Sequence, residues 1–76
     1  MYEQLKQIMC SKFQVPSAEF VPGVTFEDLG LDSLDLVELS LVIEQEIGVR
    51  ISDDELAEVG QLNNVADLVT SRRATV

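Results

Sequence analysis

Hydrophobic residues recur every three or four positions along much of the chain, which is the spacing of one face of an α-helix. The first series comprises Tyr2, Leu5, Ile8, Met9 and Phe13. It predicts an amphipathic helix that ends before Pro16, because proline disrupts a helix interior. A second series begins near Ser33 and ends at Ile47, where Gly48 is a favourable C-terminal residue. No stretch alternates convincingly as a strand would, so only helices are predicted.

The second half of the chain contains two further helical segments. The sequence Ser-Asp-Asp-Glu at 52–55 fits a capping box, in which the serine caps a helix and the glutamate lies at its third position. Gly60 keeps this helix short. A final helix is predicted by Leu62, Val65, Ala66 and Val69. Arg72 and Arg73 near its C-terminus suit the helix dipole, and residues 74–76 are expected to fray.

Residues 14–32 form a long connection between the first two helices, punctuated by Pro16, Pro22 and Gly23. A loop of this length in a compact domain must be held down by its own side chains. The candidate anchors are Val15, Phe20, Val24, Phe26 and Leu29. The predicted fold is all-α: residues 1–76 form one domain, a small bundle of three main helices plus one short helix, with a long loop between the first and second helices.

The helix predicted at 33–47 has more than one apolar stripe, whereas an ordinary surface helix has one. A core-facing stripe comprises Leu36, Leu39, Ile43 and Ile47. Another side carries Leu34, Val37 and Leu41 among the acidic residues Asp35, Glu38 and Glu44. Single exposed leucines are normal on protein surfaces, but a second stripe flanked by acids indicates a docking surface.

The chain has a formal net charge of -9. Essentially all of this negative charge comes from acidic residues in the middle of the chain. Eleven of the fourteen acidic residues lie between Glu27 and Glu58, where Arg50 is the one basic residue. A field of this sign repels nucleic acid and anionic lipid, and it attracts basic protein surfaces. Two interpretations follow: a solvated face that keeps the protein soluble, and a surface that draws in basic partners.

The residues needed for several kinds of active site are missing. The sequence has no histidine, which excludes Ser-His-Asp and Cys-His arrangements and histidine metal sites. Cys10 is the one cysteine; it can form no internal disulfide and is expected to be a small buried hydrophobe. No apolar stretch is long enough for a membrane helix, and no signal peptide is evident. We therefore expect a cytoplasmic protein that is not an enzyme and binds no metal, nucleic acid or membrane.

Ser33 stands at the start of the acidic helix, between Asp32 and a leucine. Serine is a preferred N-cap, so its simplest role is structural. Asp32 can cap the helix equally well, however, which would leave the Ser33 hydroxyl pointing outward. A phosphate on that oxygen would meet the free N–H groups and the positive end of the helix dipole. Ser33 can therefore serve as an attachment point and need not be a nucleophile.

The stretch LGLDSLDLVEL, residues 29–39, resembles the attachment motif of acyl carrier proteins, in which Asp-Ser-Leu precedes the second helix. The likeness covers nearly the whole chain: a leading helix, a long loop ending in FEDLG at 26–30, the acidic helix, and ISDDEL at 51–56. In this family the serine carries 4'-phosphopantetheine through a phosphodiester, and the match places that cofactor on Ser33.

The resemblance implies a freestanding acyl carrier protein, which holds acyl intermediates as thioesters on this arm and delivers them to enzymes of fatty acid or polyketide-type biosynthesis. Its partners would be a phosphopantetheinyl transferase, acyltransferases, ketosynthases and other enzymes with basic surfaces, and we expect a monomer. Asp32 would orient the arm and help the transferase recognise the site. The partner-binding residues would be Leu34, Asp35, Val37, Glu38, Leu41 and Glu44. An acyl pocket that opens between the second and third helices would be lined by Val37, Leu39, Ile43, Ile51, Leu56, Val59 and Leu62.

Two details differ from common forms of the family. Gly60 and Gln61 stand where many relatives have a serine or threonine cap, so the last helix is expected to start loosely. The residues before Ser33 are Leu-Gly-Leu-Asp, whereas peptidyl carriers often have a double glycine there, and this difference favours an acyl load. Two alternatives stay open: an aminoacyl or peptidyl carrier, and an acidic adaptor that is never modified and only binds basic protein surfaces.

Overall fold

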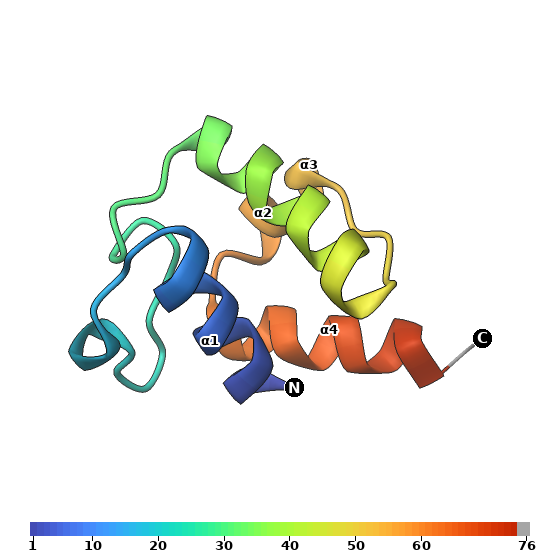
Figure 1. Cartoon of the computed structure of the whole chain (residues 1–76), viewed down its shortest axis with the longest axis horizontal. Helices are drawn as coiled ribbons and strands as arrows, with labels where there is room; N and C mark the ends of the chain where they lie inside the picture. The colour runs from blue at the N-terminus through green and yellow to red at the C-terminus, as the bar shows by residue number, and fades with distance from the viewer. Residues whose placement is uncertain (75–76) are drawn as a thin grey trace.

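Four α-helices and one turn of 3-10 helix surround a common core in the computed structural model, which describes residues 1–74 (Figure 1). In chain order they are α1 (Tyr2–Lys12), η1 (Ser17–Glu19), α2 (Ser33–Ile47), α3 (Asp53–Val59) and α4 (Leu62–Ala74). The prediction of an all-α bundle with three main helices and one short helix is therefore confirmed, with α3 as the short helix. The fraying predicted for the chain end falls mainly on residues 75–76, which lie outside the described residues, while α4 continues through Ala74.

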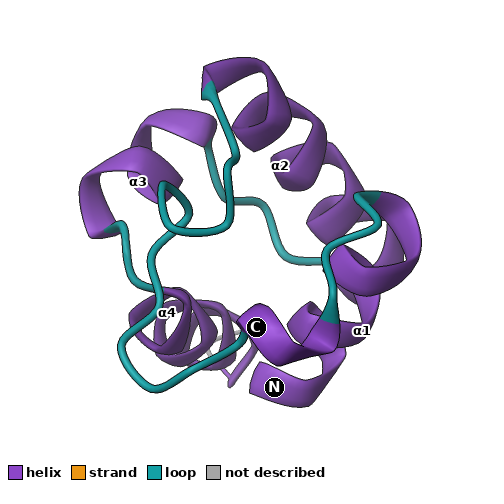
Figure 2. Ribbon diagram, turned by 90° about the vertical axis from the view of Figure 1, so that its left-hand side faces the viewer, coloured by secondary structure: helices purple, strands orange, loops and turns teal. Residues whose placement is uncertain are grey.

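The helices contact one another around the core rather than stacking in layers (Figure 2). α3 packs chiefly against α2 and α1 against α4, while smaller contacts join α1 to α2 and α3 to α4. The fully buried side chains are Leu5, Met9, Leu39, Ile43, Leu56, Leu62, Val65 and Val69. Burial of this apolar surface drives the helices together. None of the helices within residues 1–74 is long and apolar enough to cross a membrane.

The core face of α2 matches its predicted stripe with one addition. Leu36, Leu39 and Ile43 are buried, and Ile47 is half-buried. Val42 is also buried, although the periodicity of the stripe did not include it. α2 ends at Gly48, as predicted, because this residue adopts the left-handed conformation (φ 82°) that glycine tolerates best.

The long loop between α1 and α2 is held by backbone hydrogen bonds as well as by side chains. Of the five predicted anchors, Val15, Val24 and Phe26 are buried, and the other two are half-buried. In addition, the Phe26 N–H donates to the carbonyl of Gly60, and the Leu62 N–H donates to the carbonyl of Val24, both at 3.0 Å. The loop is therefore joined to the junction between α3 and α4.

The same hydrogen bonds explain how α4 begins without a serine or threonine cap. The Leu62 N–H finds its acceptor in the loop, at Val24. Gln61 accepts a hydrogen bond from the Val65 N–H through its carbonyl, and another from the Asn64 side chain through its own side-chain oxygen. The start of α4 is consequently well tied, and the expectation that it would be loose is wrong.

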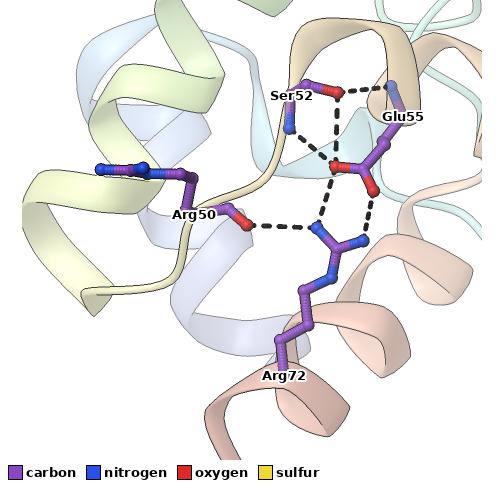
Figure 3. A network of polar contacts seen from close by, with 4 residues as sticks. All are labelled: Arg50, Ser52, Glu55 and Arg72. Carbon is purple, nitrogen blue, oxygen red and sulfur yellow. Dashed lines mark hydrogen bonds and ion pairs between the residues drawn. The ribbon is translucent and has the colours of Figure 1, made fainter. Parts of the chain in front are cut away.

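Glu55 ties the start of α3 to the end of α4 (Figure 3). The predicted capping box is present, because the Ser52 hydroxyl accepts from the Glu55 N–H and the Glu55 carboxylate accepts from the Ser52 N–H. The carboxylate also accepts two hydrogen bonds from the Arg72 guanidinium, which in turn donates to the carbonyl of Arg50. Hydrogen bonds from Arg72 and Ser52 lower the pKa of Glu55 to about 2, so the pair is ionised at neutral pH.

Candidate functional site

The N-terminus of α2 is capped by Asp32, which leaves Ser33 as the first residue of the helix. The Asp32 carboxylate accepts a hydrogen bond from the Asp35 N–H at 3.0 Å, and the Asp35 carboxylate accepts one from the Asp32 N–H at 3.1 Å. Ser33 is exposed, and its hydroxyl has no hydrogen-bond partner within residues 1–74. The structure thus assigns the cap to Asp32 and frees the Ser33 hydroxyl for other chemistry.

The surroundings of the Ser33 hydroxyl tolerate a phosphate group. The N–H groups of Ser33 and Leu34 lie in the first turn, where they have no acceptor within the helix. These groups and the helix dipole favour an anion at this position. The carboxylates of Asp32 and Asp35 already place negative charge there. The helix end therefore favours an anion on the Ser33 oxygen, while the two carboxylates oppose it.

Ser33 also borders an open cleft of about 410 Å³. The cleft is lined by Thr25, Phe26, Glu27, Leu31, Asp32, Ser33, Leu36, Ala57 and Gly60. It brings together the end of the long loop, the start of α2 and the C-terminal end of α3. No residue of the predicted acyl pocket lines it. Sequence spacing could not reveal this cleft, because its lining residues come from segments far apart along the chain, two of which are joined by the hydrogen bond between Phe26 and Gly60.

The second apolar stripe of α2 is exposed, as the sequence predicts. The exposed fractions of Leu34, Val37 and Leu41 are 77%, 41% and 51%. Glu38 and Glu44 are exposed beside them, and Glu44 lies 3.7 Å from the Arg50 guanidinium. Asp35 differs from these acids, since it is half-buried and one of its carboxylate oxygens serves the capping box.

The residues predicted to line an acyl pocket are packed in the core in this conformation. Leu39, Ile43, Ile51, Leu56 and Leu62 are all buried. Val59 is half-buried at the end of α3, and Val37 belongs to the exposed stripe. These residues belong to α2, α3, the segment before α3 and the start of α4, and α2 and α3 pack against each other.

The chain resembles known carrier proteins over most of its length. The family model "Phosphopantetheine attachment site" matches residues 3–69. An acyl carrier protein of Nitratidesulfovibrio vulgaris is 38% identical over 72 residues, which cover 93% of this chain and 95% of that protein. An acyl carrier protein of Thermosynechococcus vestitus is 37% identical over 73 residues, covering 95% of this chain and 90% of that protein.

A solved structure has the same fold. The crystal structure of an acyl carrier protein from Thermotoga maritima superposes with a TM-score of 0.73 at 28% sequence identity. The likeness covers 92% of this chain and 82% of that one. The four-helix arrangement therefore agrees with the sequence matches.

The contribution of the Asp32 cap to stability can be measured with the variant Asp32→Ala. Loss of the side-chain acceptor should lower the free energy of unfolding by about 1 kcal/mol, as for other N-cap deletions. Asp32→Asn keeps an oxygen that can accept from the Asp35 N–H, so it should stay close to the unsubstituted protein. Urea denaturation of the three proteins measures the difference. Equal losses in both variants would show that the charge of Asp32, rather than its cap, stabilises α2.

Proposed function

The chain belongs to the acyl carrier protein family, and from this premise we propose that its 4'-phosphopantetheine is attached to the hydroxyl of Ser33. Members of this family are carriers rather than enzymes, and the thiol of the arm holds acyl groups as thioesters. The observation that carries the assignment is the position of Ser33: it is exposed and unbonded at the first position of α2, beside a cap made by its neighbour.

The other serines are less suited to attachment, and one of them, Ser71, lies outside residues 3–69, which the family model matches. The Ser40 hydroxyl donates to the carbonyl of Val37 at 2.8 Å, and Ser52 serves the capping box of α3. Ser11 and Ser17 are exposed, but neither precedes a leucine or follows an aspartate. Ser33 alone combines an outward hydroxyl, a capped helix start and the Asp-Ser-Leu triplet within the segment that the family model matches. Asp32 would both preserve the helix start and orient the attached arm.

The exposed stripe of α2 supports a proposal for partner recognition. The family acts together with biosynthetic enzymes, and Leu34, Val37 and Leu41 would form the apolar centre of each contact. The carboxylates of Glu38 and Glu44, with the remaining oxygen of Asp35, would meet basic side chains of the transferase, acyltransferases and ketosynthases. Small contacts with electrostatic steering suit rapid exchange between such partners. We also propose that the protein works as a cytoplasmic monomer in fatty acid or polyketide-type biosynthesis.

Cargo would be sheltered between α2 and α3, with the cleft beside Ser33 as the entrance. The cleft is bordered by the apolar side chains of Phe26, Leu31, Leu36 and Ala57. Five of the predicted pocket residues are buried in the core in this conformation: Leu39, Ile43, Ile51, Leu56 and Leu62. An acyl chain would therefore have to displace α3 from α2 in order to enter.

Modification at Ser33 can be tested directly. Incubation with coenzyme A, magnesium and a broad-specificity phosphopantetheinyl transferase should add one phosphopantetheine, because the Ser33 hydroxyl is accessible. Ser33→Ala should abolish the addition, as measured by intact mass. Ser40→Ala serves as the matched control on the same helix and should be modified normally. Addition to any other serine, or no addition at all, would contradict the proposal and favour an unmodified adaptor.

The cargo proposal predicts a particular pattern of chemical shifts. Loading an octanoyl chain on the arm should shift the NMR signals of Leu39, Ile43 and Leu56, because α3 must move to admit the chain. The signals of Leu5 and Phe13 on the α1 side should change much less. Shifts confined to the surroundings of Ser33 would show that the cargo stays in solvent.

Glu38→Lys tests whether the acidic face of α2 steers partners or only keeps the protein soluble. At low salt, reversal of one exposed charge should slow association with the transferase by about three- to ten-fold. Glu46→Lys is the matched control, since it makes the same change two turns farther along α2 and should have a smaller effect. Salt should narrow the gap between wild type and Glu38→Lys, because exposed charges are screened over about 10 Å at 0.1 M. Equal rates at every salt concentration would assign Glu38 to a merely solvated face.

A further inference from the structure

We propose that Arg72 is a positioning residue for cargo carriage: it holds the end of α3 that lies away from Ser33, and so sets how readily α3 separates from α2. This inference rests on the proposed function, because it concerns the space into which cargo on Ser33 would enter. It is carried by the network of Figure 3, in which one guanidinium bridges α4, α3 and the segment that precedes α3.

α3 depends on contacts with other elements for its position. It has seven residues, and isolated helices of this length are unstable in water. Leu56 is its one buried residue. Its main packing partner is α2, which is the helix from which it would have to separate to admit cargo.

The two ends of α3 are held by different interactions. Near its C-terminal end, the Gly60 carbonyl accepts the Phe26 N–H at 3.0 Å, so this end is joined to the loop beside the Ser33 cleft. At its N-terminal end, the Glu55 carboxylate accepts from both terminal nitrogens of Arg72. Arg72 further donates to the Arg50 carbonyl at 3.1 Å, which secures the segment leading into α3.

Apart from the ion pair between Glu55 and Arg72, α3 and α4 make only small contacts with each other. A surface hollow of about 380 Å³ lies between parts of the two helices and is lined by Glu55, Glu58, Val59, Leu68 and Arg72. The side chains of Glu55 and Arg72 are each 36% exposed, so the pair spans the edge of this hollow. Bidentate, charge-assisted hydrogen bonds are stronger than neutral ones and fix the geometry of both partners. The pair is thus the side-chain restraint that joins this end of α3 to α4.

Loss of Arg72 should loosen α3 without unfolding it, because the Ser52 capping box does not require the guanidinium. The neighbouring Arg73 provides a matched control. It lies on the same last turn of α4, is exposed, and makes no polar contact within residues 1–74. Replacing either arginine by glutamine removes the same charge, but only Arg72→Gln removes the restraint.

The first measurement is amide hydrogen exchange in the unmodified protein. Arg72→Gln should raise exchange at the amides of residues 56–60 by roughly three- to ten-fold, in the range of an exposed but bidentate ion pair. Exchange in α1 should stay unchanged, and Arg73→Gln should leave both regions unchanged. Glu55→Gln retains a capping-box side chain but removes the charge that pairs with Arg72, so the effects of Glu55→Gln and Arg72→Gln on exchange should be less than additive, while the bond from Arg72 to the Arg50 carbonyl is lost only with Arg72.

The second measurement is the rate at which hydroxylamine cleaves the acyl thioester. The phosphopantetheine-loaded proteins are charged with octanoyl or acetyl groups, and the thioesters are cleaved with hydroxylamine. Arg72→Gln should accelerate cleavage of the octanoyl thioester by a factor similar to that seen in exchange, because α3 opens more often. The acetyl thioester is too short to be sheltered and should be cleaved at the wild-type rate, as should both thioesters of Arg73→Gln.

The outcomes separate this inference from the attachment proposal. Failure of modification at Ser33 would overturn the attachment proposal, while the exchange measurements would still test Arg72. A uniform rise of exchange in α1 and α3 would show that Arg72 only adds general stability, which would overturn the inference. Faster exchange in α3 with an unchanged octanoyl cleavage rate would overturn it as well, since α3 opening would then not control access to cargo.

Discussion

Two backbone hydrogen bonds join the long loop to the α3–α4 junction, and the arrangement of the site depends on this connection. They join Phe26 to Gly60 and Val24 to Leu62, each at 3.0 Å, and the apolar side chains of Val24 and Phe26 are buried beside them. Hydrogen bonds shielded in this way are stronger than those exposed to water. They hold this irregular part of the loop against the α3–α4 junction. Because the loop leads directly to α2, they also place Ser33 beside the C-terminal end of α3.

At the start of α2, two adjacent residues have different roles: one caps the helix and the other presents an exposed hydroxyl. Asp32 supplies the cap, and its charge suits the positive end of the helix dipole. Ser33 therefore keeps an exposed hydroxyl without loss of helix stability. The same helix then presents the exposed leucines Leu34 and Leu41 among carboxylates. Under the proposed function, attachment and recognition would share one helix, using its end and its outer side, while the inner side is buried in the core.

Under the proposed function, α3 is the element that would reconcile a tightly packed core with an acyl cargo. A chain of 76 residues has a small core, and close packing leaves little permanent empty space. Shelter for an acyl chain must then come from movement of a helix. α3 is the shortest helix and buries only Leu56, and its two ends are held by the bonds at Gly60 and Glu55. Under the proposal, α3 would move while the rest of the bundle stays folded.

Local pattern in the sequence was enough to determine the helices, the end of α2 at Gly48, the capping box at 52–55 and the exposed stripe around Val37. These features depend on residues within one or two helical turns of each other, so their spacing carries the information. Only the tertiary structure decided the firm start of α4, the burial of Val42, the lining of the cleft at Ser33 and the pairing of Arg72 with Glu55. Each of these depends on contacts between segments far apart along the chain, whose relative placement follows from packing and not from periodicity.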